Sequence, residues 1–201
     1  MTREVITRRV RQALSDKRWR HSQKVAEVAV ALAKRYHLDE EKASLAGILH
    51  DFAKEIDDGL MLKLAAEFNI INNMVERDHP NILHGPVAAA MVQETFDVGD
   101  QEVIAAIAHH TTGAAGMTDL EKIIFLADFI EPTRNFPGVD KLRRLAEESL
   151  EQAVLAGLEH TFIYLLRRGL AIHPSGIEAW NDLRRRGAAF PDPRGNSPWI
   201  P

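Results

Sequence analysis

LAGILHDFAK, residues 45–54, decides the fold of this chain, because it places the doublet His50-Asp51 within an apolar helical segment. Ile48 and Leu49 belong to the side that helical spacing predicts to be buried. Histidine nitrogens and carboxylate oxygens are ligands that first-row divalent metals accept. The stretch therefore predicts a metal site among helices, and with it hydrolytic or redox chemistry.

Further candidate ligands lie in two other apolar segments. His21 stands at the N-terminal end of the core-facing stripe of a helix that begins near Arg18. IIFLADFI, residues 123–130, is apolar on every side of a helix, so we expect Asp128 to be deeply buried. Holding a buried carboxylate without a metal or another partner is costly. The predicted metal ligands are therefore His21, His50, Asp51 and Asp128.

Three other histidines bear on the same site. His84 precedes a predicted helix, and His109 and His110 form a pair at the end of another. They are candidates for a second metal position or for contact with a substrate phosphate, and the sequence leaves both open. Solvated surface positions are expected for His37, His79 and His160.

Composition excludes several classes of function. The 201 residues are 45% apolar and 27% charged, which is ordinary for one soluble globular core. A formal net charge of −4 argues against a nucleic-acid partner. The absence of cysteine excludes disulfides, iron–sulfur clusters and thiolate catalysis. With no secretory signal and no apolar run near the roughly 20 residues of a membrane span, we expect a cytoplasmic protein without a membrane partner.

Apolar residues recur at helical spacing along most of the chain, and no segment alternates as a strand would. Asp39 is a predicted N-cap, and Thr118 with Glu121 matches a capping box. We expect one all-α domain over residues 1–190, a helical bundle with the metal site in its core, and an irregular proline-rich tail over 191–201. Helices are predicted at about 2–14, from 18, from 40, and at 57–69, 85–96, 100–110 and 118–131, followed by two more to about 170 and a short one after His173-Pro174.

Several short segments occur together and in a fixed order. They are RWRHS (18–22), GILHD (47–51) with Lys54, HG (84–85), HHTTG (109–113), Met117, EKIIFLAD (121–128), IEPTR (130–134) and PGV (137–139). In this order they resemble the HD-domain phosphohydrolase superfamily, and most closely its branch of YqeK-type symmetrical diadenosine tetraphosphate hydrolases. The likeness covers about residues 18 to 180. An HD doublet alone arises often by chance, whereas ADFIEPTR, residues 127–134, is far more specific.

The resemblance implies an HD-type fold in which His21, His50, Asp51 and Asp128 hold an iron ion. Manganese, cobalt and zinc share these ligands, and one or two ions would fit. A dinucleoside polyphosphate or ADP is the implied partner, with symmetrical hydrolysis of diadenosine tetraphosphate to two ADP. The implied nucleotide contacts are Arg18, Lys54, His84, His109, His110, Asp128, Arg134 and the segment Ala171, Ile172, His173, Pro174, Ser175 and Gly176.

The expected mechanism is attack of a metal-activated water on a bridging phosphate. Asp51 would hold the metal, and Lys54, one helical turn past the doublet, would lean over it. His84 and His109 are the candidates for protonating the leaving oxygen, and the sequence does not choose between them. Further positive charge at the phosphates would come from Arg18 and Arg134.

Other functions remain open from the sequence. Some helical HD-type proteins bind two irons and activate oxygen, and His84 with His109 would complete such a pair. An oxygenase of this kind stops working without oxygen, whereas hydrolysis does not. A nucleotide monophosphatase of the same superfamily would differ in its products. A non-catalytic signalling module fits less well, because such modules typically lack the ligand set that this chain retains. A homodimer is a further possibility, since proline- and tryptophan-containing tails sometimes dock on a partner subunit.

The chain also departs from related patterns. Lys54 stands where guanosine-polyphosphate hydrolases carry an acidic residue, which disfavours that branch. No Gly-Tyr-Pro follows the core, which disfavours the cyclic-dinucleotide phosphodiesterases. Trp180 stands where we expect an arginine in the family pattern, so the resemblance does not extend to a binding role for the last helix.

Overall fold

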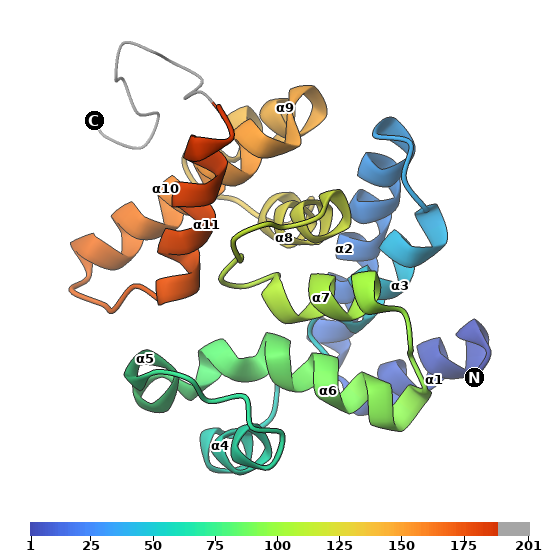
Figure 1. The fold of residues 1–201 in the computed structure, drawn as a ribbon. Helices are drawn as coiled ribbons and strands as arrows, with labels where there is room; N and C mark the ends of the chain where they lie inside the picture. Colours follow the sequence, from blue (N-terminus) through green and yellow to red (C-terminus); the bar gives the residue numbers. More distant parts are fainter. Residues whose placement is uncertain (189–201) are drawn as a thin grey trace.

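The computed structural model describes residues 1–188, which form eleven α-helices and one 3-10 helix (Figure 1). No β-strand occurs among these residues, so the predicted all-α fold is confirmed. The predicted domain boundary at residue 190 and the tail 191–201 lie outside the described residues. The elements in chain order are α1 (Arg3–Ala13), α2 (Asp16–Arg35), α3 (Glu40–Leu49), α4 (Asp58–Glu67), α5 (Met74–Asp78), η1 (Pro80–Leu83), α6 (His84–Phe96), α7 (Gln101–His109), α8 (Asp119–Ile130), α9 (Val139–Glu148), α10 (Leu150–Arg167) and α11 (Pro174–Arg185).

Helix α8 forms the centre of the molecule and contacts α2, α3, α7, α9 and α10. In Figure 1, α2 and α3 lie on one side of α8, and α10 and α11 lie on the other. Ile123, Ile124 and Leu126 on α8 are fully buried. Truncating one such side chain to alanine typically costs about 2–5 kcal/mol of stability. The buried helix α8 therefore packs against α2, which carries His21, and α3, which ends just before His50.

Side-chain caps fix where the ligand-bearing helices begin. The Asp39 carboxylate accepts hydrogen bonds from the backbone N–H groups of Glu41 and Lys42, as predicted, and starts α3. Thr118 and Glu121 form the predicted capping box at the start of α8. Such caps satisfy N–H groups that have no partner within the helix. The registers of α3 and α8 are thereby set from their N-termini.

Two glycines allow helices to approach closely beside the site. A Cβ atom on Gly47 would lie 2.6 Å from the Cα of Ala26, so only glycine lets α3 cross α2 at this distance. A Cβ atom on Gly85 would lie 2.8 Å from the carbonyl oxygen of Ala108, so the same holds for α6 against α7. Gly47 is three residues before His50, and Gly85 directly follows His84. The close crossings thus bring candidate ligands on different helices together.

The structure corrects two expectations about helical positions. Helix α3 ends at Leu49, and Lys54 lies in a run of turns where backbone N–H groups bond to carbonyls three residues before, not on the same helix as the doublet. The Asp128 side chain is 23% exposed and so is not deeply buried. The reason is that one side of the last turn of α8 is open, where Asp128 and Phe129 are half-buried while Ala127 and Ile130 stay buried.

Two short elements were not predicted, α5 and η1. Each is about one turn long, so it contains too few residues for a readable periodicity. A capping box between Asn73 and Glu76 marks the start of α5 and was readable in the sequence. No helix among residues 1–188 has both the length and the apolar character needed to cross a membrane.

Candidate metal centre and substrate site

Three buried imidazoles are fixed in the same way at the ends of three helices. Each presents Nδ1 to a backbone carbonyl three residues earlier, at 2.6–2.7 Å. With Nδ1 donating its proton, the Nε2 lone pair is free to bind a metal. The pairs are His50 with Gly47, His84 with Asn81, and His110 with Ile107.

The Asp51 carboxylate lies at the centre of four imidazoles. Its Oδ2 is 3.3 Å from Nε2 of His50 and 3.5 Å from Nε2 of His21. Its Oδ1 is 3.3 Å from Nε2 of His84 and 3.7 Å from Nε2 of His110. The two oxygens therefore divide the histidines into two pairs, one on each side of a single buried carboxylate.

Asp128 completes the group from α8. Its Oδ1 lies 3.0 Å from Nε2 of His21. The residues form three overlapping sets of three, and within each set the donor atoms lie within 4.8 Å of one another. We call the six residues of these sets the metal centre: His21, His50, Asp51, His84, His110 and Asp128.

The metal centre fits a first-row divalent ion. Nε2 of His21 and Nε2 of His50 are buried and have no hydrogen-bond partner. Buried polar atoms without a partner are costly, whereas a metal ion would satisfy both. Mixed imidazole and carboxylate donors are typical of iron, manganese and zinc sites. All four ligands predicted from the sequence lie in this group, together with His84 and His110.

The electrostatics of the centre keep its residues in the forms that bind metals. Burial alone would raise the pKa of Asp51, but the electrostatic effect of His50 and hydrogen bonds from the neighbouring imidazoles lower it well below its usual range. Burial lowers the pKa of His84 to about 4, against the opposing effect of Asp51. At neutral pH the carboxylate is therefore ionised and this imidazole is neutral, as metal ligation requires.

Three cations border the metal centre. Nη1 of Arg18 lies 2.6 Å from Oδ2 of Asp51, and the Arg134 guanidinium pairs with the Asp128 carboxylate. Nζ of Lys54 lies 3.4 Å from Nδ1 of His84. Burial lowers the pKa of Lys54, although the nearby Asp51 opposes that shift. The site thus places positive charge beside the metal ligands, where a polyanion would need it.

The structure separates the two adjacent histidines. His110 belongs to the metal centre, whereas His109 turns away from it and places Nδ1 2.5 Å from Oε1 of Glu121. The His109 side chain is 39% exposed. Consecutive residues at a helix end point in different directions, so only one of the pair reaches the core.

Glu131 is a site residue whose role the sequence reasoning missed. The residue is 1% exposed, and its carboxylate accepts a hydrogen bond from the backbone N–H of Thr133 at 2.6 Å and lies 3.3 Å from Nδ1 of His21. It thereby orients His21 as backbone carbonyls orient the other imidazoles. The available signal is the position of Glu131 in the IEPTR segment, three residues after the predicted ligand Asp128.

A hollow of about 160 Å³ lies beside the metal centre, and we call it the smaller hollow. Ala171, Ile172, His173 and Gly176 of the predicted binding segment line it. Pro174 and Ser175 form the first turn of α11 and are not among its lining residues. The other lining residues are Ile82, Thr111, Thr112, Leu158, Thr161, Phe162 and Leu165.

The remaining histidines are placed as follows. His37 and His79 are exposed, as predicted. His160 is not a surface residue, because it is half-buried with its ring centroid 4.7 Å from that of Phe136. The ring centroid of Phe129 lies 5.7 Å from that of His160. Trp180 is half-buried on α11 and lies 5.9 Å from the guanidinium of Arg184.

Residues 18–133 match the family model for the HD domain. This range holds all six residues of the metal centre, and the helices around them form the core described above. Fold and site therefore define an HD-domain protein.

Proteins of known name are similar over nearly the whole chain. A symmetrical bis(5'-nucleosyl)-tetraphosphatase of Staphylococcus aureus is 38% identical, covering 90% of this chain and 94% of that protein. A protein of the same name from Bacillus subtilis is 37% identical, covering 91% and 98%. A crystal structure of a predicted HD superfamily hydrolase involved in NAD metabolism, from Clostridium acetobutylicum, has a TM-score of 0.89 at 35% identity and covers 92% of this chain and 98% of that one. The chain belongs to the HD-domain family of these tetraphosphatases and is a hydrolase.

Proposed function

We propose that this chain hydrolyses diadenosine tetraphosphate symmetrically to two ADP, using a divalent metal bound at the metal centre. The observation that carries the proposal is the convergence of four imidazole Nε2 atoms on the two oxygens of Asp51. The relatives named symmetrical bis(5'-nucleosyl)-tetraphosphatase support this choice of substrate.

His21, His50, Asp51 and Asp128 are the proposed ligands of an iron ion. His84 and His110 would complete a second position with Oδ1 of Asp51, because these three residues form a donor set that shares only Asp51 with the set of His21, His50 and Asp51. Manganese, cobalt and zinc accept the same donors. A bound divalent ion supplies a water of lowered pKa and polarises a phosphoryl oxygen.

The chain's own residues would position and neutralise the tetraphosphate. Lys54, Arg18 and Arg134 border the metal centre, so each can meet phosphate oxygens that approach it. Fixed positive charge is the largest contribution that a protein makes to phosphoryl transfer. These three residues are therefore the proposed phosphate contacts, with His84, His110 and Asp128 at the same phosphates.

His109 is the better of the two candidates for protonating the leaving oxygen. Both ring nitrogens of His84 are engaged, Nδ1 with the Asn81 carbonyl and Nε2 beside Asp51. The His109 imidazole is half-exposed, and Glu121 contacts only its Nδ1. The Glu121 carboxylate accepts the Nδ1–H of His109, so a doubly protonated ring would hold its second proton on Nε2 and could donate it from there.

The segment Ala171 to Gly176 is the proposed nucleoside contact, because most of it lines the smaller hollow. The apolar walls of this hollow suit a nucleobase, and Thr111 links it to the metal centre through contacts of 3.1 Å from its hydroxyl to Nε2 of His84 and of His110. The product ADP would bind with its nucleoside in the same smaller hollow.

The experiment is to remove metal with a chelator, restore individual metals and add diadenosine tetraphosphate without oxygen. ADP as sole product, appearing only with metal, is the expected result. ATP plus AMP would indicate asymmetrical cleavage and contradict the proposal. Release of inorganic phosphate from nucleoside monophosphates alone would support the monophosphatase.

A di-iron oxygenase is the second candidate, because the histidines fall into two groups that share Asp51. An activity that requires oxygen and gives no ADP would support it over hydrolysis. A cytoplasmic location and a homodimer stay predictions, which fractionation of the source cells and light scattering would test.

A further inference from the structure

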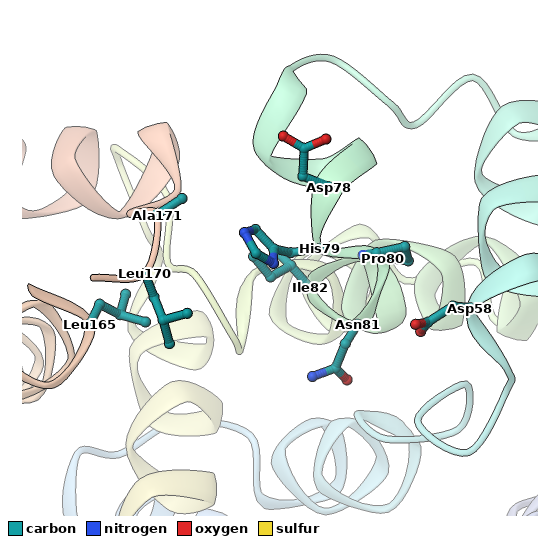
Figure 2. A pocket seen from close by; sticks show the side chains of 9 residues that line it. All are labelled: Asp58, Asp78, His79, Pro80, Asn81, Ile82, Leu165, Leu170 and Ala171. Atoms are coloured by element: carbon teal, nitrogen blue, oxygen red, sulfur yellow. The ribbon is translucent and has the colours of Figure 1, made fainter. Parts of the chain in front are cut away.

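A second hollow, of about 330 Å³, lies next to the smaller one, and we call it the larger hollow. Figure 2 shows Leu165, Leu170 and Ala171 on one side of it, facing His79 and Ile82 on the other. Its residues come from the start of α4, the end of α5, η1, the end of α10 and the loop between α10 and α11. The remaining lining residues are Asp58, Asp78, Pro80 and Asn81.

The two hollows share one wall. Ile82, Leu165 and Ala171 line both of them. A ligand in one hollow is therefore separated from a ligand in the other by the thickness of these side chains. Small-molecule pockets typically have about 300–1,000 Å³, so with about 330 Å³ and 160 Å³ neither hollow has room for two nucleosides.

Both hollows adjoin the same histidine of the metal centre. Asn81 of the larger hollow accepts the His84 Nδ1–H at its backbone carbonyl, at 2.6 Å. Thr111 of the smaller hollow has its hydroxyl oxygen 3.1 Å from Nε2 of the same His84. A polyphosphate lying on the metal centre can thus direct one end to each hollow.

The charged residues that line the larger hollow indicate which part of a nucleotide fits there. Its lining includes the carboxylates of Asp58 and Asp78 and contains no lysine or arginine. Carboxylates repel phosphate but accept hydrogen bonds from ribose hydroxyls and from the amino group of adenine. Leu165, Leu170 and Ile82 supply apolar surface for the face of a base. The lining therefore fits the nucleoside end of a nucleotide and excludes its phosphates.

We propose that the larger hollow binds the second nucleoside of the dinucleoside tetraphosphate, while the first occupies the smaller hollow. The proposal rests on the proposed function for the identity of the substrate. It makes the bound dinucleotide a folded one, with its two nucleosides on either side of the Ile82–Leu165–Ala171 wall and its phosphates at the metal centre. The two ADP halves then stand on opposite sides of the central bond.

Leu170→Trp tests the proposal by filling the larger hollow alone. Leu170 is 42% exposed and does not line the smaller hollow, so a larger side chain is tolerated by the fold. Leu166→Trp is the matched control, because Leu166 is 66% exposed and lines neither hollow. Metal-loaded wild type and both variants are assayed for the KM of diadenosine tetraphosphate and the inhibition constant of ADP.

For Leu170→Trp we expect the KM to rise about tenfold, since base stacking in such a pocket is typically worth about that factor or more. The inhibition constant of ADP should change less than about twofold, because a single nucleotide keeps the smaller hollow. Leu166→Trp should match wild type in both. An unchanged KM, or a KM and inhibition constant that rise together, would overturn the proposal.

A second variant addresses the carboxylates. Asp58→Asn with Asp78→Asn retains the shape of the larger hollow and removes its negative charge. The KM for the dinucleotide should rise severalfold while the inhibition constant of ADP stays constant. A KM equal to that of wild type would contradict hydrogen bonding of the second nucleoside to these side chains.

A binding measurement separates this proposal from the proposed function. If metal-loaded wild type leaves diadenosine tetraphosphate intact, the proposed function fails, and calorimetric titration with ADP then decides the second site. Two ADP bound per wild-type chain and one per Leu170→Trp chain would support it. The same number in both proteins would overturn it.

Discussion

The metal centre and the two hollows beside it are built from different kinds of contact. At the metal centre, His50, His84 and His110 are almost fully buried and each is fixed by a backbone carbonyl. Around the hollows, α5 and η1 are one turn long and Leu170 is 42% exposed. Catalytic groups must be held in a fixed geometry. Segments that recognise a substrate often lie on loops, whose sequence and structure can vary more.

One hydrogen bond joins α5 to the start of the last helix. Oε1 of Glu76 lies 3.0 Å from Nε2 of His173, whose Nδ1 accepts the N–H of Ser175 at the start of α11. The Glu76–His173 pair therefore connects α5 to a wall of the smaller hollow. Removing a contact from the metal centre should abolish chemistry, while removing this one should alter substrate affinity only.

Asp51→Ala should have the largest effect, because the carboxylate contacts both pairs of imidazoles. Loss of an outer partner of a metal ligand typically costs about 10–100-fold in metal affinity, so loss of this central ligand should cost more than about 100-fold. Metal content by elemental analysis and turnover should fall together. Asp140→Ala, which removes a carboxylate 78% exposed, is the control. A full metal complement in Asp51→Ala would refute its assignment as a ligand.

Lys54→Ala should lower turnover by about 100-fold, the usual effect of removing one charge-stabilising group from a transition state. Metal content should stay the same, because Lys54 contacts the outer nitrogen of His84 and donates no ligand atom. Steady-state rates and elemental analysis measure the two. Lys63→Ala on the exposed face of α4 should match wild type. Unchanged turnover would remove Lys54 from the mechanism.

Glu131→Gln should weaken metal binding by about tenfold, because the neutral amide orients His21 less firmly than a carboxylate does. Activity should recover as added metal rises, which distinguishes a positioning role from loss of a ligand. Titration of metal-free protein followed by assay measures this. Glu67→Gln, an exposed carboxylate at the end of α4, controls for charge. Wild-type metal affinity would contradict the role of Glu131.

Glu76→Gln should have the smallest effect, a rise in KM of about 3–5-fold with metal content and maximal turnover unchanged. Replacing a charge-assisted hydrogen bond by a neutral one costs about 1 kcal/mol, which corresponds to that factor. Glu94→Gln, an exposed residue of α6, should leave KM unaltered. A loss of metal in Glu76→Gln would mean that the two regions are not independent.

Much of the metal centre could be predicted from the sequence. His21, the His50-Asp51 doublet and Asp128 carry ligand chemistry at helical positions, and the structure brings all four together. Periodicity is local, so it correctly indicated which helix faces turn inward. It could not decide between His109 and His110, since adjacent side chains at a helix end diverge and only packing against other helices selects one.

The proposed nucleoside-binding region could be predicted less completely from the sequence. The resemblance indicated Ala171 to Gly176, but no pattern indicated that η1 and α5 would face this segment. Glu76 and His173 are 97 residues apart in the chain. Pairing over such a separation depends on the path of every helix between the two residues.

By itself the sequence determined the all-helical fold and the donor set that a metal requires, because both follow from residue type and short-range spacing. Only the tertiary structure decided that His110 belongs to that set, that Glu131 orients His21, and that two hollows share one wall. These are contacts between segments distant in the chain, and close helix crossings at Gly47 and Gly85 set their geometry.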